Sequence, residues 1–192
     1  MDMLGDEKLF YERFYALHRD PALMKVFERF GIEAFRRSSV LEGFNAFLRA
    51  HEFNGDTCVE IGTYNGLTAI VLARYFRRVI TIDIVDQPQK VEIAAFLGVT
   101  NVEFVNVADN AEKASVIGSL SFDAAYVDGD HARDTFTDFA LVGRCRRVIF
   151  HEAWPAQQPV EKLLASLRPV VRHGKFALWQ ATKPVEELRA CH

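Results

Sequence analysis

Cysteine is scarce in this 192-residue chain: Cys58, Cys145 and Cys191 are the only three, odd in number and widely spaced. Such usage excludes a disulfide framework and a zinc knuckle, so reduced thiols are expected. No apolar run reaches the roughly 18 residues that a membrane span needs. The start, residues 1–7, lacks the basic and apolar stretches of a secretion signal. We therefore expect a cytoplasmic protein without a membrane partner.

An excess of positive charge is also lacking, because the formal net charge is −3. Neutralising the phosphates of a nucleic acid needs clustered Lys and Arg, so the composition argues against a nucleic-acid partner. Apolar residues make up 49% and charged residues 26% of the chain, the balance of an ordinary globular protein. The length of 192 residues favours one domain with a substantial core.

Residues 6–50 contain only helical patterns. Asp20-Pro21 is a good N-cap followed by proline at the first helical position. Three apolar stripes share helical spacing: Phe10, Phe14 and Leu17; Leu23, Val26, Phe27 and Phe30; and Val40, Phe44 and Phe47, with Gly31 and Gly43 interrupting the pattern. We expect residues 1–52 to form a helical N-terminal extension or cap. Its aromatic residues could pack on the core, form a lid over a substrate pocket, or be buried in a homodimer.

From residue 57 onward, short β-rich runs alternate with segments of helical periodicity. The runs are residues 57–61, 79–84, 102–105, 124–128 and 148–151. Strands that are apolar throughout and alternate with helices indicate a parallel sheet covered on both faces. Two further runs, 169–172 and 175–180, meet at the tight turn His173-Gly174, which makes the last strand antiparallel. The prediction is a three-layer α/β fold over residues 53–192 with a mainly parallel sheet.

The segments between the runs carry helical stripes of their own. Residues 65–77 are nearly all apolar on the inner side. The other stripes are Val91, Ala94 and Ala95; Phe136, Phe139 and Ala140; and Val160, Leu163, Leu164 and Leu167. These stripes predict the helix faces that cover the sheet.

The strongest local signal is the segment 59–66, V-E-I-G-T-Y-N-G, which follows a strand and opens a helix. Glycine lets the backbone turn sharply and approach a ligand, and the start of a helix offers free N–H groups. Asp83 ends the second strand 21 residues after Gly62, and a carboxylate at about that separation can bind ribose hydroxyls. A dinucleotide site would need G-x-G-x-x-G, whereas Tyr64 replaces the second glycine. Glu60 adds a negative charge that suits an ammonium and a sulfonium better than two phosphates.

Titratable side chains gather at the ends of two later strands. Asp128, Asp130 and His131 follow one strand, and His151-Glu152 follows the next. Because adjacent parallel strands lie about 4.8 Å apart, both groups could face one pocket. Such a density of titratable groups in a cleft is typical of a functional site.

The glycine segment and its acidic partner resemble the class I S-adenosylmethionine-dependent methyltransferases, whose first motif has the form E-x-G-x-x-x-G. The resemblance implies a Rossmann-like fold with a seven-stranded sheet and S-adenosylmethionine as cofactor. Gly62 and the nearby backbone would face the methionine part, and Asp83 the ribose. Asp109 would lie near the adenine, or would simply cap the next helix. The implied cofactor-binding set is Glu60, Gly62, Tyr64, Gly66, Asp83, Asp109 and Asp128.

The two later strand ends are similar to a subgroup of small methyltransferases that carry D-G-D-H after the fourth strand. They are more distantly similar to catechol-type O-methyltransferases, which use a divalent metal. By position, Asp128, His151 and Glu152 match the metal ligands, and His131 matches the family's catalytic lysine. This sequence departs from that pattern in two ways. Histidine stands in place of the lysine, and His-Glu stands in place of Asp-Asn or His-Asp. Residues 143–147 also lack the usual Pro-Gly turn, and these departures bear on the metal more than on the cofactor.

Two interpretations of this cluster stay open. Oxygen ligands such as Asp128 and Glu152 suit Mg²⁺, and an added imidazole shifts the preference toward manganese, iron or zinc. A bound metal would lower the pKa of a substrate hydroxyl. Without a metal, His131 would act as the general base, and His131 and Asp128 are therefore the candidate catalytic residues.

We expect methyl transfer from S-adenosylmethionine to a small-molecule acceptor, at oxygen, with or without a divalent metal. A second hypothesis is a cofactor-binding partner or sensor subunit that has lost the transfer activity. A third is a nicotinamide-dependent oxidoreductase, which the G-x-x-x-G spacing and Glu60 disfavour.

Overall fold

The structure, a computed structural model, describes residues 20–32, 34–153 and 158–181, and the side chains of residues 34–40 are outside its description. The predicted stripe Phe10, Phe14 and Leu17 lies outside the described residues, as does the side chain of Val40. None of the helices in the described ranges is both long enough and apolar enough to cross a membrane.

Seven strands form one sheet, with the order β3-β2-β1-β4-β5-β7-β6. The strands β1 to β5 are parallel, and β7 runs antiparallel to both β5 and β6. Their bounds are Gly55–Ile61 (β1), Phe76–Asp83 (β2), Val102–Asn106 (β3), Ala124–Val127 (β4), Arg147–Phe150 (β5), Val170–His173 (β6) and Phe176–Gln180 (β7). The predicted parallel sheet with an antiparallel last strand is confirmed.

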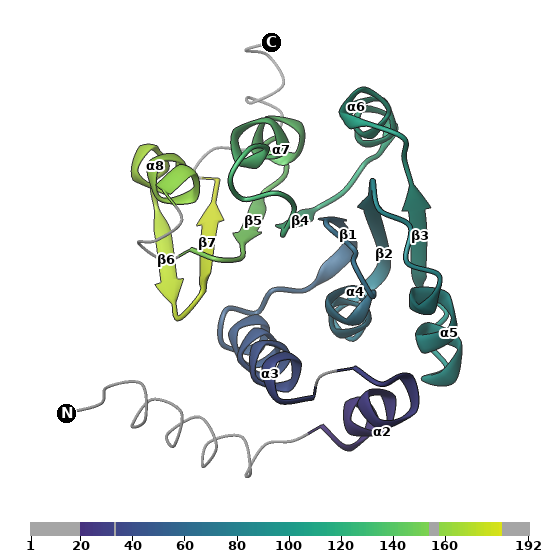
Figure 1. Cartoon of the computed structure of the whole chain (residues 1–192). Coiled ribbons are helices and arrows are strands. Elements are labelled where there is room, and N and C mark those ends of the chain that lie inside the picture. The colour runs from purple at the N-terminus through teal and green to yellow at the C-terminus, as the bar shows by residue number, and fades with distance from the viewer. Residues whose placement is uncertain (1–19, 33, 154–157, 182–192) are drawn as a thin grey trace, which may run out of the picture.

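Helices cover both faces of this sheet, which gives the predicted three layers (Figure 1). One face carries α2 (Pro21–Phe30), α3 (Ala34–Ala50), α4 (Leu67–Leu72) and α5 (Gln89–Phe96). The other face carries α6 (Asn110–Ser119), α7 (Thr135–Val142) and α8 (Gln158–Ser166). The Rossmann-like α/β fold predicted from the strand–helix alternation is therefore correct.

Alternate residues of each strand enter two separate hydrophobic clusters, one on each face of the sheet. In β1, Cys58 packs with the α2–α5 side, whereas Val59 and Ile61 pack with the α6–α8 side. All residues of β4 are buried. Burial on both faces explains why the strands read as continuous apolar runs in the sequence.

The N-terminal helices share a core with the sheet. Leu23 of α2 and Phe44 of α3 belong to the same buried cluster as Tyr126 of β4. Asp20 caps α2 by accepting hydrogen bonds from the N–H groups of Ala22 and Leu23, as its position before Pro21 predicted. The division into an extension (1–52) and a cofactor domain (53–192) stays a prediction, since α2 and α3 pack directly on the predicted domain.

Two glycines of the N-terminal region behave differently. Gly31 ends α2 in the left-handed conformation with φ 63°, as a C-terminal glycine should. Gly43 was expected to interrupt the helical pattern, but it lies within the continuous helix α3. A Cβ at this position would lie 3.7 Å from the Phe176 ring, an ordinary van der Waals contact, so the helix accommodates this position without a break.

Three expectations about the later helices were wrong. The helix predicted over 65–77 ends at Leu72, because β2 already begins at Phe76.

In α5 the buried face is Lys90, Ile93 and Ala94, and Val91 is exposed. In α7 the buried face is Thr135, Asp138 and Val142, and Phe136 and Ala140 are exposed. In both helices a charged side chain with a bonding partner takes the inner face: Lys90 bonds to Asn106, and Asp138 to Lys113. The α8 stripe is confirmed.

Candidate active site

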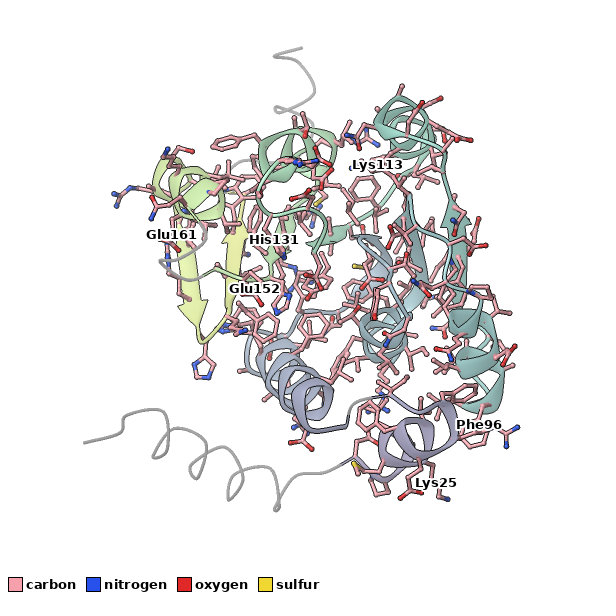
Figure 2. The ribbon with its side chains drawn as sticks, viewed as in Figure 1. Lys25, Phe96, Lys113, His131, Glu152 and Glu161 are labelled. Carbon is pink, nitrogen blue, oxygen red and sulfur yellow. The ribbon has the colours of Figure 1, made fainter. Side chains whose placement is uncertain are left out.

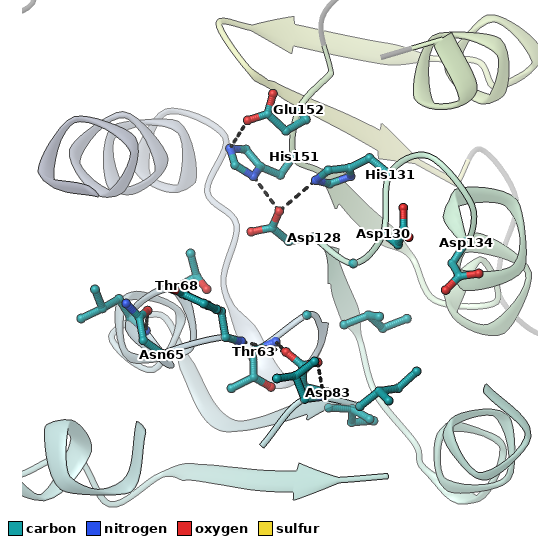
Figure 3. Close-up of a pocket in the computed structure, with 18 of the residues that line it drawn as sticks. Thr63, Asn65, Thr68, Asp83, Asp128, Asp130, His131, Asp134, His151 and Glu152 are labelled. Carbon is teal, nitrogen blue, oxygen red and sulfur yellow. Dashed lines mark hydrogen bonds and ion pairs between the residues drawn. The ribbon is translucent and has the colours of Figure 1, made fainter. Parts of the chain in front are cut away.

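A cavity of about 860 Å³ opens where the parallel strands end (Figure 3). The strand tips lie in register, with Ile61 of β1 opposite both Ile82 of β2 and Val127 of β4, and Val127 opposite Phe150 of β5. The loops that follow these strands therefore start at one level. This is the edge where open α/β sheets bind their ligands.

The glycine loop after β1 forms one wall of the cavity. Gly62 has φ 95°, and a Cβ there would lie 2.2 Å from the carbonyl oxygen of Asp128. Gly66 has φ 77°, and its Cβ would lie 3.0 Å from the Phe104 ring. Both positions need glycine, for backbone conformation and for space. Tyr64 lies between them at φ 45° with its side chain half exposed at the cavity.

Asp83, at the tip of β2, bonds to the glycine loop. Its Oδ2 accepts hydrogen bonds from the backbone N–H groups of Thr63 and Tyr64, each 2.8 Å long. Its Oδ1 accepts a bond of 2.9 Å from the N–H of Val85. A carboxylate offers about four lone-pair sites, so Asp83 also retains acceptor capacity toward the cavity that it lines.

Glu60 lies behind the cavity wall instead of lining the cavity. Along β1 it alternates with Ile61, so its side chain points toward the α4 side, where the Thr81 hydroxyl donates a hydrogen bond to it. Burial raises the pKa of Glu60 to about 8. The prediction that Glu60 faces a cationic ligand as a fixed negative charge is therefore not supported by its position.

Asp128 joins two imidazoles at the other side of the cavity. Its Oδ1 lies 2.6 Å from Nδ1 of His151 and 3.2 Å from Nε2 of His131 (Figure 3). Its Oδ2 accepts a hydrogen bond of 3.2 Å from the hydroxyl of the fully buried Tyr126. Burial by itself would raise the pKa of Asp128, but the hydrogen bonds with His131 and His151 outweigh it and hold this pKa below its usual value.

The neighbours of His151 come from β7 and from its own loop. Its ring stacks on Phe176 at 5.2 Å between centroids and 20° between planes. Glu152 adopts a left-handed backbone conformation with φ 51°. Its Oε1 lies 3.7 Å from His151 Nε2 and 3.1 Å from Nζ of Lys175. The imidazole of His151 thus packs between these neighbours at the cavity that it lines, and Figure 2 shows Glu152 close to His131 on this side of the molecule.

A possible metal-ligand set differs from the predicted one. Asp128, His131 and His151 each offer one ligand atom, and these atoms lie within 4.8 Å of one another. The sequence predicted Asp128, His151 and Glu152, so His131 takes the place of Glu152. The reason is that the loop after β4 folds back over its own strand end, while Glu152 is drawn toward Lys175.

Asp109 is not brought to the site. Its Oδ1 accepts hydrogen bonds of 2.9 Å from the N–H groups of Ala111 and Glu112, which makes it the N-cap of α6. It does not line the cavity. Of the two interpretations left open for Asp109, the helix cap is therefore confirmed, and a place beside the adenine has no support.

Sequence reasoning missed Lys113, which lines the cavity from α6 although its side chain is almost completely buried. Lys113 Nζ donates to Oδ1 of Asp138, on α7, at 2.5 Å. The available signal was helical spacing, since Lys113 precedes the buried Ile117 by four residues and so shares its inner face. Lys175, in the β6–β7 hairpin, is a second cavity-lining residue that was not predicted.

Comparison with known proteins identifies the fold. No protein-family model matches the sequence, and no curated protein matches it. An O-methyltransferase from Bacillus cereus in complex with SAH (S-adenosylhomocysteine) superposes with a TM-score of 0.64 at 16% identity, covering 84% of this chain and 91% of the other. A Geobacter sulfurreducens methyltransferase gives 0.60 at 19% identity, covering 85% and 89%.

An rRNA methylase from Streptococcus thermophilus gives a TM-score of 0.55 at 14% identity, covering 70% of this chain and 95% of the other. Solved proteins with different acceptors thus share this architecture. The chain has the class I methyltransferase fold, which the first motif had indicated, and its chemistry must be argued from its own site.

Proposed function

We propose that this protein is an S-adenosylmethionine-dependent methyltransferase that methylates an oxygen atom of a small molecule. The observation that carries the proposal is one cavity bounded by the glycine loop, by Asp83 and by the Asp128–histidine cluster. The first two features suit a nucleoside with an amino-acid tail, and the third suits activation of an acceptor. Solved proteins of the same fold that contain SAH support this choice of cofactor.

The cofactor would lie across the glycine loop. The backbone of Gly62 and its neighbours would hold the methionine part, because no side chain there blocks close approach. Asp83 would accept hydrogen bonds from the ribose hydroxyls with its remaining lone pairs. Ile84 and Val85 follow it, are exposed, and line the cavity, so they offer an apolar surface to a flat base.

The acceptor would be activated beside Asp128. As the acceptor oxygen bonds to the methyl carbon, the carbon–sulfur bond breaks, and the hydroxyl proton passes to an imidazole. His131 and His151 both face Asp128, whose carboxylate orients them and stabilises an imidazolium. The products would be a methyl ether and S-adenosylhomocysteine. The protein would contribute mainly alignment and proton removal.

A divalent metal is compatible with the same cluster. Asp128, His131 and His151 would hold it, and one carboxylate with two imidazoles favours Mn²⁺ or Zn²⁺ over Mg²⁺. Such an ion would lower the pKa of the acceptor hydroxyl. The compact donor set supports this assignment.

The charge of the cavity supports a small acceptor that carries no phosphate. Its described lining contains five carboxylates, from Asp83, Asp128, Asp130, Asp134 and Glu152. The two lysines of the lining, Lys113 and Lys175, both pair with carboxylates. Like charges repel, so this cavity disfavours nucleic acid and other polyanions.

Calorimetry on the purified protein tests the cofactor assignment. We expect S-adenosylhomocysteine to bind and to raise the melting temperature, and NAD to do neither. Binding of NAD alone would overturn the proposal in favour of a nicotinamide enzyme.

Transfer is tested by incubating the protein with labelled S-adenosylmethionine and either the small-molecule or the RNA fraction of a cell extract. We expect label in the small-molecule fraction, in a form that resists hot alkali as an ether does. Label in RNA alone would refute the acceptor class. Cofactor binding with no transfer to any fraction would support the partner-subunit hypothesis.

A further inference from the structure

A buried tyrosine contacts the Asp128 carboxylate on the side away from the histidines. Tyr126 lies on β4 two residues before Asp128, and side chains two apart along an extended chain point to the same side. The hydroxyl of the fully buried Tyr126 lies 3.2 Å from Oδ2 of Asp128. An ionised carboxylate can only accept a hydrogen bond, so the phenol is the donor. Tyr126 is not among the described residues that line the cavity, so it can act on a ligand only through Asp128.

The two oxygens of Asp128 have different partners. Oδ1 lies 2.6 Å from Nδ1 of His151 and 3.2 Å from Nε2 of His131, whereas Oδ2 is the oxygen that Tyr126 contacts. Dashed lines in Figure 3 join one carboxylate oxygen to both imidazoles. A carboxylate without a partner on Oδ2 could turn about its Cβ–Cγ bond, because that torsion is only weakly restricted. The hydrogen bond from Tyr126 therefore determines which oxygen faces the histidines.

The ring of Tyr126 is itself held by the N-terminal helix α3. Phe44, which is fully buried, packs on this ring at 4.5 Å between centroids. The same Phe44 ring lies 5.3 Å from that of Phe176, which stacks on His151. One phenylalanine thus supports the two aromatic residues that contact Asp128 and His151. Because a protein core is close-packed, the phenol cannot follow the carboxylate if the carboxylate turns.

We propose that Tyr126 is a positioning residue for methyl transfer, whose hydroxyl fixes the Asp128 carboxylate so that Oδ1 faces both imidazoles. This inference rests on the proposed function, in which the Asp128–histidine cluster activates the acceptor. The protein contributes mainly alignment to such a reaction, and a carboxylate that orients two imidazoles must itself be held in one orientation. A phenylalanine at this position would fill the core equally well, so packing alone does not account for the hydroxyl.

The test uses Tyr126→Phe, which removes one hydroxyl and keeps the ring. In protein with isotope-labelled histidine, nuclear magnetic resonance follows exchange with water of the His151 Nδ1 proton, which Asp128 accepts. We expect this exchange to become at least tenfold faster, because a carboxylate that turns breaks a hydrogen bond to a charged group. Tyr75→Phe is the matched control, since it removes a phenol hydroxyl that bonds to Asn45. It should leave the exchange as in wild type.

Two further measurements on Tyr126→Phe distinguish positioning from a general loss of structure. Its affinity for S-adenosylhomocysteine by calorimetry should lie within about twofold of wild type, because sites without shared partners behave independently. Its rate of label transfer from saturating S-adenosylmethionine to the small-molecule fraction should fall at least tenfold, because misalignment of reacting groups costs rate steeply. A merely structural hydroxyl would lower the free energy of unfolding and leave both the exchange and the transfer rate unchanged.

Three results would overturn the inference. The first is exchange in Tyr126→Phe no faster than in Tyr75→Phe. The second is a wild-type His151 proton that already exchanges as fast as that of the exposed His173. The third is faster exchange in Tyr126→Phe with an unchanged transfer rate. Absence of cofactor binding to the wild type would instead overturn the proposed function, and the exchange measurement would still show whether Tyr126 orients the carboxylate.

Discussion

Gly62 packs so closely against Asp128 that a Cβ on the glycine would lie 2.2 Å from the aspartate's carbonyl oxygen. This contact joins the loop after β1 to the loop after β4, which lie 66 positions apart in the chain. The proposed cofactor loop and the Asp128–histidine cluster are therefore mechanically coupled. A substitution that displaces one of these loops should therefore displace the other as well.

Gly62→Ala should disrupt both. The positive φ alone costs an alanine roughly 1–2 kcal/mol, and the clash with Asp128 adds to that cost. We expect a lower free energy of unfolding in urea and loss of S-adenosylhomocysteine binding by calorimetry. Gly118→Ala is the matched control, because a Cβ there meets nothing within 4 Å. It should stabilise α6 by about 0.5–1 kcal/mol, and a similar gain at Gly62 would contradict the described packing.

Asp83→Ala removes the acceptor of the Thr63 and Tyr64 N–H groups. Affinity for S-adenosylhomocysteine should fall at least tenfold, because hydrogen bonds to a charged group contribute roughly 1.5–3 kcal/mol each. Asp83→Asn keeps one acceptor oxygen and should lie between wild type and Asp83→Ala. Asp86→Asn is the control, since Asp86 is exposed and pairs only with Lys90 among the described residues. Unchanged affinity in Asp83→Ala would remove the ribose role from this residue.

Glu60 should make the stability of the protein depend on pH. Because burial raises its folded-state pKa to about 8, the folded state holds a proton that the unfolded state has released above its ordinary value of 4.5. The free energy of unfolding should therefore fall as pH rises between about 5 and 8, by at most roughly 1.4 kcal/mol per pH unit. Glu60→Gln should flatten this part of the profile in urea titrations. Glu103→Gln, at an exposed pair with Arg78, is the control and should leave the slope as in wild type. An unchanged slope in Glu60→Gln would mean that the Glu60 carboxyl stays ionised over this pH range, and it would contradict the prediction.

Manganese titration followed by electron paramagnetic resonance distinguishes the two ligand sets. If Asp128, His131 and His151 hold the ion, then His131→Gln should weaken binding at least tenfold, as loss of a metal ligand or of its orienting neighbour does. Glu152→Gln should weaken binding less than His131→Gln does, because Glu152 pairs with Lys175 and is only a neighbour of the ligand His151. His173→Gln, in the exposed hairpin, is the control. The reverse order, with Glu152→Gln the damaging change, would restore the set predicted from sequence.

Structural features that depend on the order of neighbouring residues could be predicted from the sequence. Strands with buried residues on both faces, the cap at Asp20 and the loop between β1 and α4 all follow from neighbouring residues. Asp83, at the tip of the second strand, was predicted to bind the ribose because a strand tip and a glycine turn have a regular spacing in such folds, and that role stays a prediction. Its hydrogen bonds to the loop amides of Thr63 and Tyr64 were not predicted, and they place this carboxylate beside the glycine loop.

Features that depend on tertiary partners were not predictable in the same way. The buried faces of α5 and α7 were misjudged because Lys90 and Asp138 become acceptable inside only when Asn106 and Lys113 meet them. Glu60 was predicted to contact the ligand because its position in the sequence does not show toward which face of the sheet its side chain points. His131 was separated from the metal set because sequence alignment by position cannot show how a loop folds back on Asp128.

The direction of β7 has a consequence for how such a protein could change. Because β7 runs against its neighbours, its first residue and the preceding turn reach the same edge as the ends of the parallel strands, where Phe176 stacks on His151 and Lys175 meets Glu152. The hairpin thus contacts His151 and Glu152, whereas the glycine loop forms another wall of the cavity. Exchanging its few residues would reshape the wall of the cavity beside His151 and leave the glycine loop in place.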